Sequence, residues 1–259
     1  MEVIHRIGGN LSGERERRAL IKVGIELPPE EFVFLISEDD VRWPSVSELV
    51  AHFDLLDFVS TSFTDIERFR AGFLSMDGNW HNGYPQPEDD YQEVSYDLTN
   101  YCHLCGVGAV QKAPLRIKSE PKWGRRSIMQ LNWIFDELFT PPEVWRSVFR
   151  PFGVGCRPVL NRSGVKEFET VMQLVFEGSS PLDTTGLSYE TCLVCSRRKY
   201  LPNVRGFIPK PLNPVGSAFK SVEDFGSGAS ASKEVFVAQD LYRDITASKL
   251  LGAVFSPCA

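Results

Sequence analysis

Apolar and polar residues recur along the first quarter of this chain in short segments, which predict alternating strands and helices. Ser45 and Glu48 have the spacing of a capping box, so a helix is expected to run to about Phe53. A second helix is expected to begin at Ser62 or Thr64, with one apolar face: Ile66, Phe69 and Phe73. Three apolar runs are typical of strands: residues 18–27, 31–36 and 57–60.

Residues 75–93 are rich in Gly, Pro, Asn and Asp, a composition typical of a loop. This segment is the clearest candidate for a domain boundary. We therefore expect an N-terminal α/β segment over residues 1–93 and an α+β segment over residues 94–259. The two could also form one continuous domain.

The rest of the chain again mixes both patterns. Thr140, Pro141 and Glu143 have the residue types of a helix N-terminus, and this helix should end near Pro151. A last helix is expected to begin at Asp240 and to end at Gly252. Strands are predicted over residues 128–135, 167–177, 234–239 and 253–255, with a short turn over residues 135–139. Such irregular alternation predicts an α+β fold with mixed sheets.

Composition is that of an ordinary globular protein. The chain has 259 residues, of which 42% are apolar and 24% charged, and it can bury a substantial core. Its sequence contains no run approaching the ~20 apolar residues of a membrane-spanning helix. Residues 1–13 lack the apolar region of a secretory signal, so we expect a cytoplasmic protein with reduced thiols.

Two cysteine pairs with the same spacing are the strongest chemical signal. Each C-x-x-C pair can direct two thiolates at one ion, and two such knuckles complete a four-sulfur structural zinc site. The predicted ligands are Cys102, Cys105, Cys192 and Cys195, which would form a zinc-ribbon-like element. The 86 residues between the pairs are far more than a simple ribbon has. Free thiols, disulfides and a redox-active pair therefore remain alternatives.

Other reactive residues give weaker signals. Cys156 and Cys258 are isolated and are expected to be buried, inert thiols. His103 lies between two ligating cysteines and should point outward. A catalytic role would have to involve His81, which lies in a polar loop. The sequence has none of the common nucleotide-binding, metalloprotease or serine-hydrolase motifs, so we do not expect an enzyme.

Charge gives two further hypotheses, although the net charge is −6. A nucleic-acid-binding zinc ribbon would use two basic clusters: Arg116, Lys118, Lys122, Arg125 and Arg126, and then Arg197, Arg198, Lys199 and Arg205. We consider nucleic acid the less favoured partner, because these residues could equally be solvated or balance thiolate charge. A protein partner would instead contact an aromatic and acidic surface: Trp43, Trp80, Tyr84, Glu88, Asp89, Asp90 and Tyr91.

The two knuckles and the C-terminal pattern resemble a family of small bacterial proteins with a double C-x-x-C-G motif. This family includes immunity proteins of polymorphic toxin systems and was first noted as a paralogous group in myxobacteria. The similarity rests on residues 102–106, 192–195 and 236–255, and on the element from Arg42 to Val46. It covers about half of the chain, and Ser196 stands where the family has glycine. The resemblance implies a cytoplasmic, zinc-stabilised protein that binds and neutralises a partner toxin.

Overall fold

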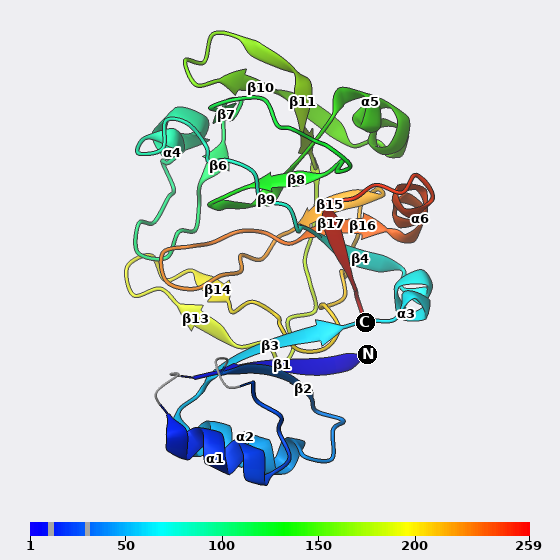
Figure 1. Ribbon diagram of the computed structural model, residues 1–259. Coiled ribbons are helices and arrows are strands. Elements are labelled where there is room, and N and C mark those ends of the chain that lie inside the picture. Colours follow the sequence, from blue (N-terminus) through cyan, green and yellow to red (C-terminus); the bar gives the residue numbers. More distant parts are fainter. Residues whose placement is uncertain (10–12, 29–31) are drawn as a thin grey trace. The chain divides into compact units, whose positions relative to one another are not determined.

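The computed structural model describes residues 1–9, 13–28 and 32–259 (Figure 1). The chain forms two compact units. Unit 1 contains residues 1–67 and 203–206, and unit 2 contains residues 68–202 and 207–259. This division differs from the one predicted between residues 93 and 94, because the strand over residues 73–78 pairs within a sheet of unit 2.

Unit 1 is a three-stranded antiparallel sheet, in the order β2-β1-β3, with two helices on one face (Figure 1). Leu20 and Val46 from the helices are fully buried against Ile7 and Ile36 of the sheet. The elements are β1 (Glu2–Gly8), α1 (Glu14–Lys22), β2 (Val33–Ser37), α2 (Trp43–Phe53), β3 (Leu56–Ser62) and α3 (Asp65–Arg70), the last spanning the division between the units.

Unit 2 contains two five-stranded sheets, with the orders β7-β10-β11-β9-β8 and β12-β15-β16-β4-β17. Its strands are β4 (Phe73–Gly78), β5 (Tyr96–Asp97), β6 (Val110–Gln111), β7 (Arg116–Ile117), β8 (Met129–Leu131), β9 (Ile134–Thr140), β10 (Gly155–Asn161), β11 (Glu167–Val175), β12 (Gly178–Ser180), β13 (Tyr189–Thr191), β14 (Arg198–Tyr200), β15 (Ala218–Ser221), β16 (Val235–Ala238) and β17 (Ala253–Pro257). Its helices are α4 (Tyr91–Ser95), α5 (Pro142–Val144), which continues as a π-helical turn (Trp145–Phe149) and a 3-10 turn (Arg150–Phe152), and α6 (Gln239–Ala247).

One hydrophobic core joins the two large sheets. Leu74 of β4, Leu138 of β9, Leu174 of β11 and Val237 of β16 are each fully buried in it, and Ile245 of α6 covers it. These side chains come from strands that are far apart in the sequence. Unit 2 is therefore stabilised mainly by non-local burial.

The α+β prediction, with mixed sheets and a zinc-ribbon-like element, is confirmed. The predicted helix over residues 45–53 and the strand over residues 167–177 correspond to α2 and β11. The strand predicted over residues 31–36 corresponds to β2, although residue 31 lies outside the described residues. The predicted strands over residues 57–60, 234–239 and 253–255 also match β3, β16 and β17 to within a few residues.

The strand predicted over residues 18–27 is wrong, because its first part belongs to α1. Glu14 and Arg18 form an i,i+4 ion pair on the exposed side of this helix, while Leu20 is buried on the other. Gly24, at φ +87°, then redirects the chain. The apolar run therefore combines a helical end with an extended segment.

Four other local predictions need correction. The loop predicted over residues 75–93 begins as buried β4, and the turn predicted over residues 135–139 is the middle of β9. Thr140 ends β9 and donates its hydroxyl to the Ser127 carbonyl at 2.7 Å, so it does not cap the next helix. Asp240 is the second residue of α6 and not its cap.

Candidate metal centre

Each cysteine pair lies at the end of a short antiparallel hairpin of unit 2. The first pair is between β5 and β6, and the second is between β13 and β14. The two turns have the same hydrogen bonds. The Cys102 N–H donates to the Val107 carbonyl at 3.0 Å, and the Cys192 N–H donates to the Arg197 carbonyl at 2.9 Å. The two knuckles are therefore two copies of one local structure.

Both turns need a left-handed residue immediately after the second cysteine. Gly106 has φ +79° and Ser196 has φ +59°, and each donates its N–H back to the first cysteine of its pair. Left-handed backbone is accessible to glycine but costs roughly 1–2 kcal/mol for other residues. A side chain at Gly106 would also lie only 2.3 Å from the Ala229 carbonyl oxygen. Glycine is thus required in the first knuckle, whereas Ser196 tolerates strain in the second.

The four cysteine sulfurs converge, with all of them lying within 4.8 Å of one another. Cys102 Sγ is 3.7 Å from Cys192 Sγ, and Cys105 Sγ is 3.6 Å from Cys195 Sγ. A disulfide would need about 2.05 Å. A tetrahedron with metal–sulfur bonds of about 2.3 Å has edges of about 3.8 Å, which fits the observed spacing. The cluster can therefore hold a metal ion, and its donor set suits zinc.

Electrostatics also favours a cation among these sulfurs. Burial raises the pKa of the Cys105 thiol to about 12, and the neighbouring sulfurs add to this effect. Backbone N–H groups act in the opposite direction at the second knuckle: the Arg197 N–H lowers the pKa of Cys195 to about 6, and the N–H groups of Cys195 and Val194 lower the pKa of Cys192. Since thiolates are the ligands, a divalent cation would offset the remaining unfavourable charge.

Lys199 supports the centre from within the protein. It follows the second knuckle on β14, and only 2% of it is exposed. Its ammonium donates to the carbonyls of Cys105, Gly228 and Ser230 at 2.9, 2.5 and 2.9 Å. One buried charge thus ties the second hairpin to the first knuckle and to the Gly- and Ser-rich segment over residues 226–232. The composition of that segment is typical of a flexible connection, but these hydrogen bonds anchor it at Gly228 and Ser230.

Arg197 makes a second cross-connection between the knuckles. Its guanidinium donates to the Val107 carbonyl at 3.1 Å and to the Asn100 carbonyl at 2.5 Å. A side chain on Gly108 would lie 2.3 Å from this guanidinium, so the glycine makes room for it. Arg197 and Lys199 thus bind backbone carbonyls beside the knuckles, and their balancing of thiolate charge stays a prediction.

The remaining residues of interest lie outside the cluster. His103 is exposed and packs edge-on against Tyr101, with ring centroids 4.9 Å apart. Cys156 and Cys258 are partly buried free thiols, and burial raises the pKa of both, to about 12 for Cys258. His81 pairs as an isolated bridge with Gln130.

The predicted partner-binding residues are only partly brought together. Tyr84 and Tyr91 both pack against Trp133, with ring centroids 4.5 and 6.2 Å apart. Glu88, Asp89 and Asp90 are exposed in the turn that precedes α4.

Two tryptophans of that set have other surroundings. Trp80 packs against Trp123 and lies under the Arg126 guanidinium. Trp43 belongs to unit 1, where its ring lies 3.8 Å from the ring of His5. Trp43 thus packs against the unit 1 core.

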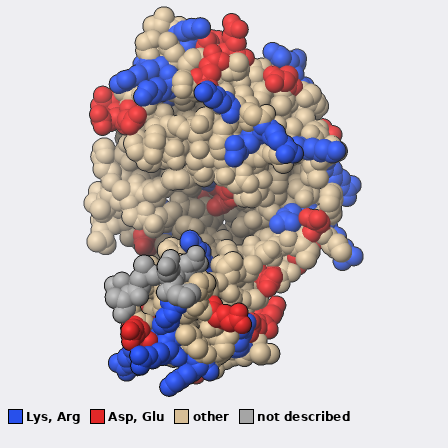
Figure 2. All heavy atoms as spheres, viewed as in Figure 1, with Lys and Arg blue, Asp and Glu red and all other residues tan. Residues whose placement is uncertain are grey.

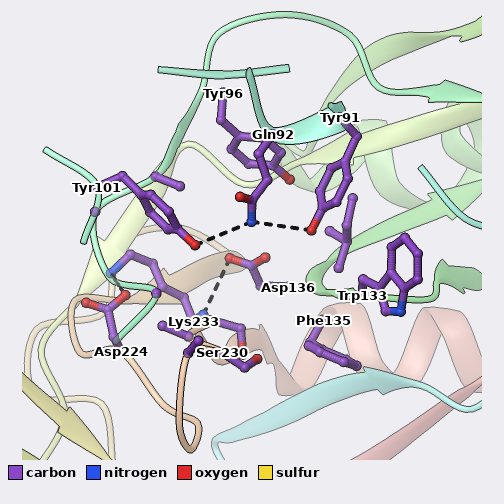
Figure 3. A pocket seen from close by; sticks show the side chains of 17 residues that line it. Tyr91, Gln92, Tyr96, Tyr101, Trp133, Phe135, Asp136, Asp224, Ser230 and Lys233 are labelled. Atoms are coloured by element: carbon purple, nitrogen blue, oxygen red, sulfur yellow. Dashed lines mark hydrogen bonds and ion pairs between the residues drawn. The ribbon is translucent and has the colours of Figure 1, made fainter. Parts of the chain in front are cut away.

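A cavity of about 500 Å³ opens beside the first knuckle, and Gly106 and Gly108 form part of its wall. Aromatic side chains of unit 2 surround it: Tyr91, Tyr96, Tyr101, Trp133 and Phe135 (Figure 3). Asp136 and Asp224 add two carboxylates, and residues 229–233 complete the lining. This volume is in the range of small-ligand sites.

The second basic cluster is largely engaged in contacts within the protein, whereas Lys118, Lys122, Arg125 and Arg126 of the first cluster are exposed. Arg197 and Lys199 bind carbonyl groups, as described above, and Arg198 lies 4.7 Å from the Tyr189 ring centre. Arg205 belongs to unit 1 and pairs with Glu38. On the face drawn in Figure 2, Lys and Arg side chains are interspersed with Asp and Glu.

No protein-family model matches the chain, and no curated protein shows significant similarity to it. Among residues 1–9, 13–28 and 32–259, no helix is long and apolar enough to cross a membrane.

Sequence reasoning missed three features of this region: Trp133, Asp136 and the segment over residues 229–233. Each lies in a stretch whose sequence pattern is ordinary, and only the fold brings them to the first knuckle. Asn132-Trp133 does carry a weak signal, because a polar residue interrupts the apolar run over residues 128–135 and marks the hairpin turn.

Proposed function

We propose that this protein is a zinc-stapled protein-binding module. The observation that carries the proposal is the closed set of four converging sulfurs, whose first knuckle also forms a wall of the aromatic cavity. Zinc bound by four thiolates has no open coordination position for water or substrate, so its role is to stabilise structure. A rigid knuckle beside an aromatic recess is suited to recognition.

We further propose that the module is of the immunity type and neutralises a partner toxin. The double knuckle resembles that family, and the net charge of −6 would favour association with a basic partner. Tyr84 and Trp133, 42% and 48% exposed, provide the large aromatic surface that is enriched at protein interfaces. The exposed acidic turn over residues 88–90 lies next in sequence to Tyr91.

Nucleic-acid binding has less support. Arg197 and Lys199 would have to break hydrogen bonds inside the knuckle region to contact phosphate. This alternative predicts a steep decrease of affinity with increasing salt. Titration of single-stranded and duplex oligonucleotides at low salt tests it directly.

Metal content is the first experimental test. Purified protein should contain about one zinc per chain, and the double variant Cys102→Ser, Cys192→Ser should lose both the zinc and thermal stability. The matched control is Cys156→Ser, which removes a thiol outside the cluster and should retain the zinc. Metal-free wild-type protein of unchanged stability would refute the staple.

Partner binding needs its own test. Proteins captured by the wild-type chain should include one whose expression is toxic, and co-expression of this chain should relieve that toxicity. A captured set in which no member is toxic, or toxicity that persists on co-expression, would refute the immunity role and leave the zinc staple unaffected.

A further inference from the structure

The cavity beside the first knuckle combines aromatic walls with carboxylates. Tyr91, Tyr101 and Trp133 face it from α4, from the first knuckle hairpin and from the β8–β9 turn (Figure 3). Aromatic ring faces attract organic cations, and carboxylates attract them more strongly. Both groups occur here in one recess.

Asp136 shares its counter-ion with Glu137. Lys220 Nζ lies 3.3 Å from Asp136 Oδ2 and 2.7 Å from Glu137 Oε1, so one ammonium serves two carboxylates. The other donor to Asp136, the backbone N–H of Lys233, is 3.4 Å away. Since both distances are long for hydrogen bonds, the carboxylate retains capacity to accept from a ligand.

The ammonium at the cavity edge is also engaged elsewhere. Lys233 Nζ donates to the Val222 carbonyl at 2.7 Å and lies 3.5 Å from Asp224. The charged side chains of the lining itself are the carboxylates of Asp136 and Asp224 and the ammonium of Lys233. The buried Lys220–Glu137 pair, Arg197 and Lys199 lie behind this lining. Within the lining, the two carboxylates favour a cationic guest.

Trp133 is held in a conformation that few tryptophans adopt. It occupies the turn between β8 and β9 at φ +69°, where glycine or asparagine is favoured, and its side chain is 48% exposed. The Asn132 side chain anchors the turn through a 2.8 Å hydrogen bond to the Gly83 carbonyl. The left-handed backbone places the Trp133 side chain in the cavity lining, and such backbone outliers are typical of binding sites.

Gln92 organises the other side of the recess. Its amide nitrogen lies 3.5 Å from the hydroxyl oxygens of both Tyr91 and Tyr101 (Figure 3). Tyr91 and Tyr101 both line this wall of the recess. Asp136 lies across from them, with a side chain that is 24% exposed and thus accessible.

We propose that this cavity binds an organic cation, specifically the guanidinium of an arginine side chain supplied by a partner protein. A guanidinium is planar, so it can stack on Trp133 while donating to the Asp136 carboxylate in a bidentate manner. The supply of the guanidinium by a partner protein rests on the proposed function. The binding of a guanidinium does not, since the recess would bind the same group on a small molecule.

Calorimetric titration with N-acetyl-arginine amide tests this inference, with the neutral isostere N-acetyl-citrulline amide as the comparison. We expect saturable binding with a Kd of roughly 1 mM for the arginine probe and at least about tenfold weaker binding of the citrulline probe. Asp136→Asn should weaken arginine binding by about tenfold or more. The matched control Glu169→Gln, which alters an exposed acid outside the cavity lining, should have no effect.

Equal binding of the two probes, no saturation by about 10 mM, or an unchanged Kd in folded Asp136→Asn would overturn the inference. Tighter binding of agmatine, a free guanidine, or of spermidine, a free polyamine, than of the arginine probe would assign the recess to a small-molecule cation and overturn the side-chain source. If the arginine probe binds but none of the captured proteins is toxic, only the immunity role is refuted. A partner bound equally by wild type and Asp136→Asn would refute only the cavity inference.

Discussion

Replacement of Lys199 by methionine should be among the most damaging single changes in unit 2. Methionine retains much of the volume of the side chain but has no donor, so the carbonyl of buried Cys105 and the carbonyls of the exposed residues Gly228 and Ser230 lose their partner. A buried unsatisfied group costs about 1–3 kcal/mol and a water-accessible one less, and relief of the buried ammonium's desolvation offsets part of the sum. We expect a net loss of about 2–3 kcal/mol in the free energy of unfolding.

The assay is chemical denaturation at neutral pH, together with transfer of zinc to a chromogenic chelator. A loss of this size corresponds to a decrease in Tm of roughly 10 °C for a unit of this length. Zinc transfer should also become faster, because the same ammonium holds the backbone of the first knuckle. Lys118→Met, at an exposed position, is the control and should change stability by less than about 0.5 kcal/mol.

The reasoning is refuted if Lys199→Met unfolds within about 1 kcal/mol of the wild type. Such a result would mean that water or a rearranged segment satisfies the carbonyls at little cost. Faster zinc transfer without a loss of stability would limit the role of Lys199 to its charge near the thiolates.

Three further predictions concern the knuckles, a titrating carboxyl and the core. Ser196→Gly should stabilise the protein by up to about 1 kcal/mol, because it relieves the strain of a left-handed backbone. Gly106→Ser should destabilise it by more than about 2 kcal/mol, because the new side chain would collide with a backbone carbonyl. Thermal unfolding measures both changes, and equal effects of the two variants would contradict the backbone argument. Burial raises the pKa of Glu234 from 4.5 to about 7, so between these pH values the folded protein retains a proton that the unfolded chain releases. The free energy of unfolding should therefore fall by about 3 kcal/mol as the pH rises through this range. Glu234→Gln should abolish that part of the decline, and a variant with the wild-type pH profile of unfolding would contradict the assignment to Glu234. Phe236→Ala should lower the free energy of unfolding by about 3–5 kcal/mol, because Phe236 is fully buried. Leu193→Ala, at a side chain that is 95% exposed, should leave the denaturation midpoint nearly unchanged. A small effect at Phe236 would mean that neighbouring core residues fill the cavity left by the ring.

Local chemistry explains why the knuckles were predictable. The C-x-x-C spacing and the glycine after Cys105 define a turn that needs few other residues. The same spacing at Cys192 identified the second turn despite Ser196. What the spacing could not determine is that the two turns meet, since this depends on the packing of β5, β6, β13 and β14 within unit 2.

The errors have a common physical origin. Residues 75–78 have a loop-like composition, yet β4 is buried because β16 and β17 pair with it from far along the chain. Residues 135–139 similarly become strand because β8 and β11 flank β9. The cavity is less predictable still, as its walls come from separate segments that only tertiary structure brings together.

The cysteines that meet in the cluster are 90 positions apart in sequence, which has a consequence for synthesis. At translation rates of about 5–20 residues per second, the first pair emerges roughly 5–20 s before the second. During that interval two thiols of the nascent chain lack their eventual neighbours and are open to oxidation or to a competing soft metal. Correct loading should therefore depend on the redox state and metal supply around the ribosome, and delayed metal uptake would mark the completion of folding in this unit.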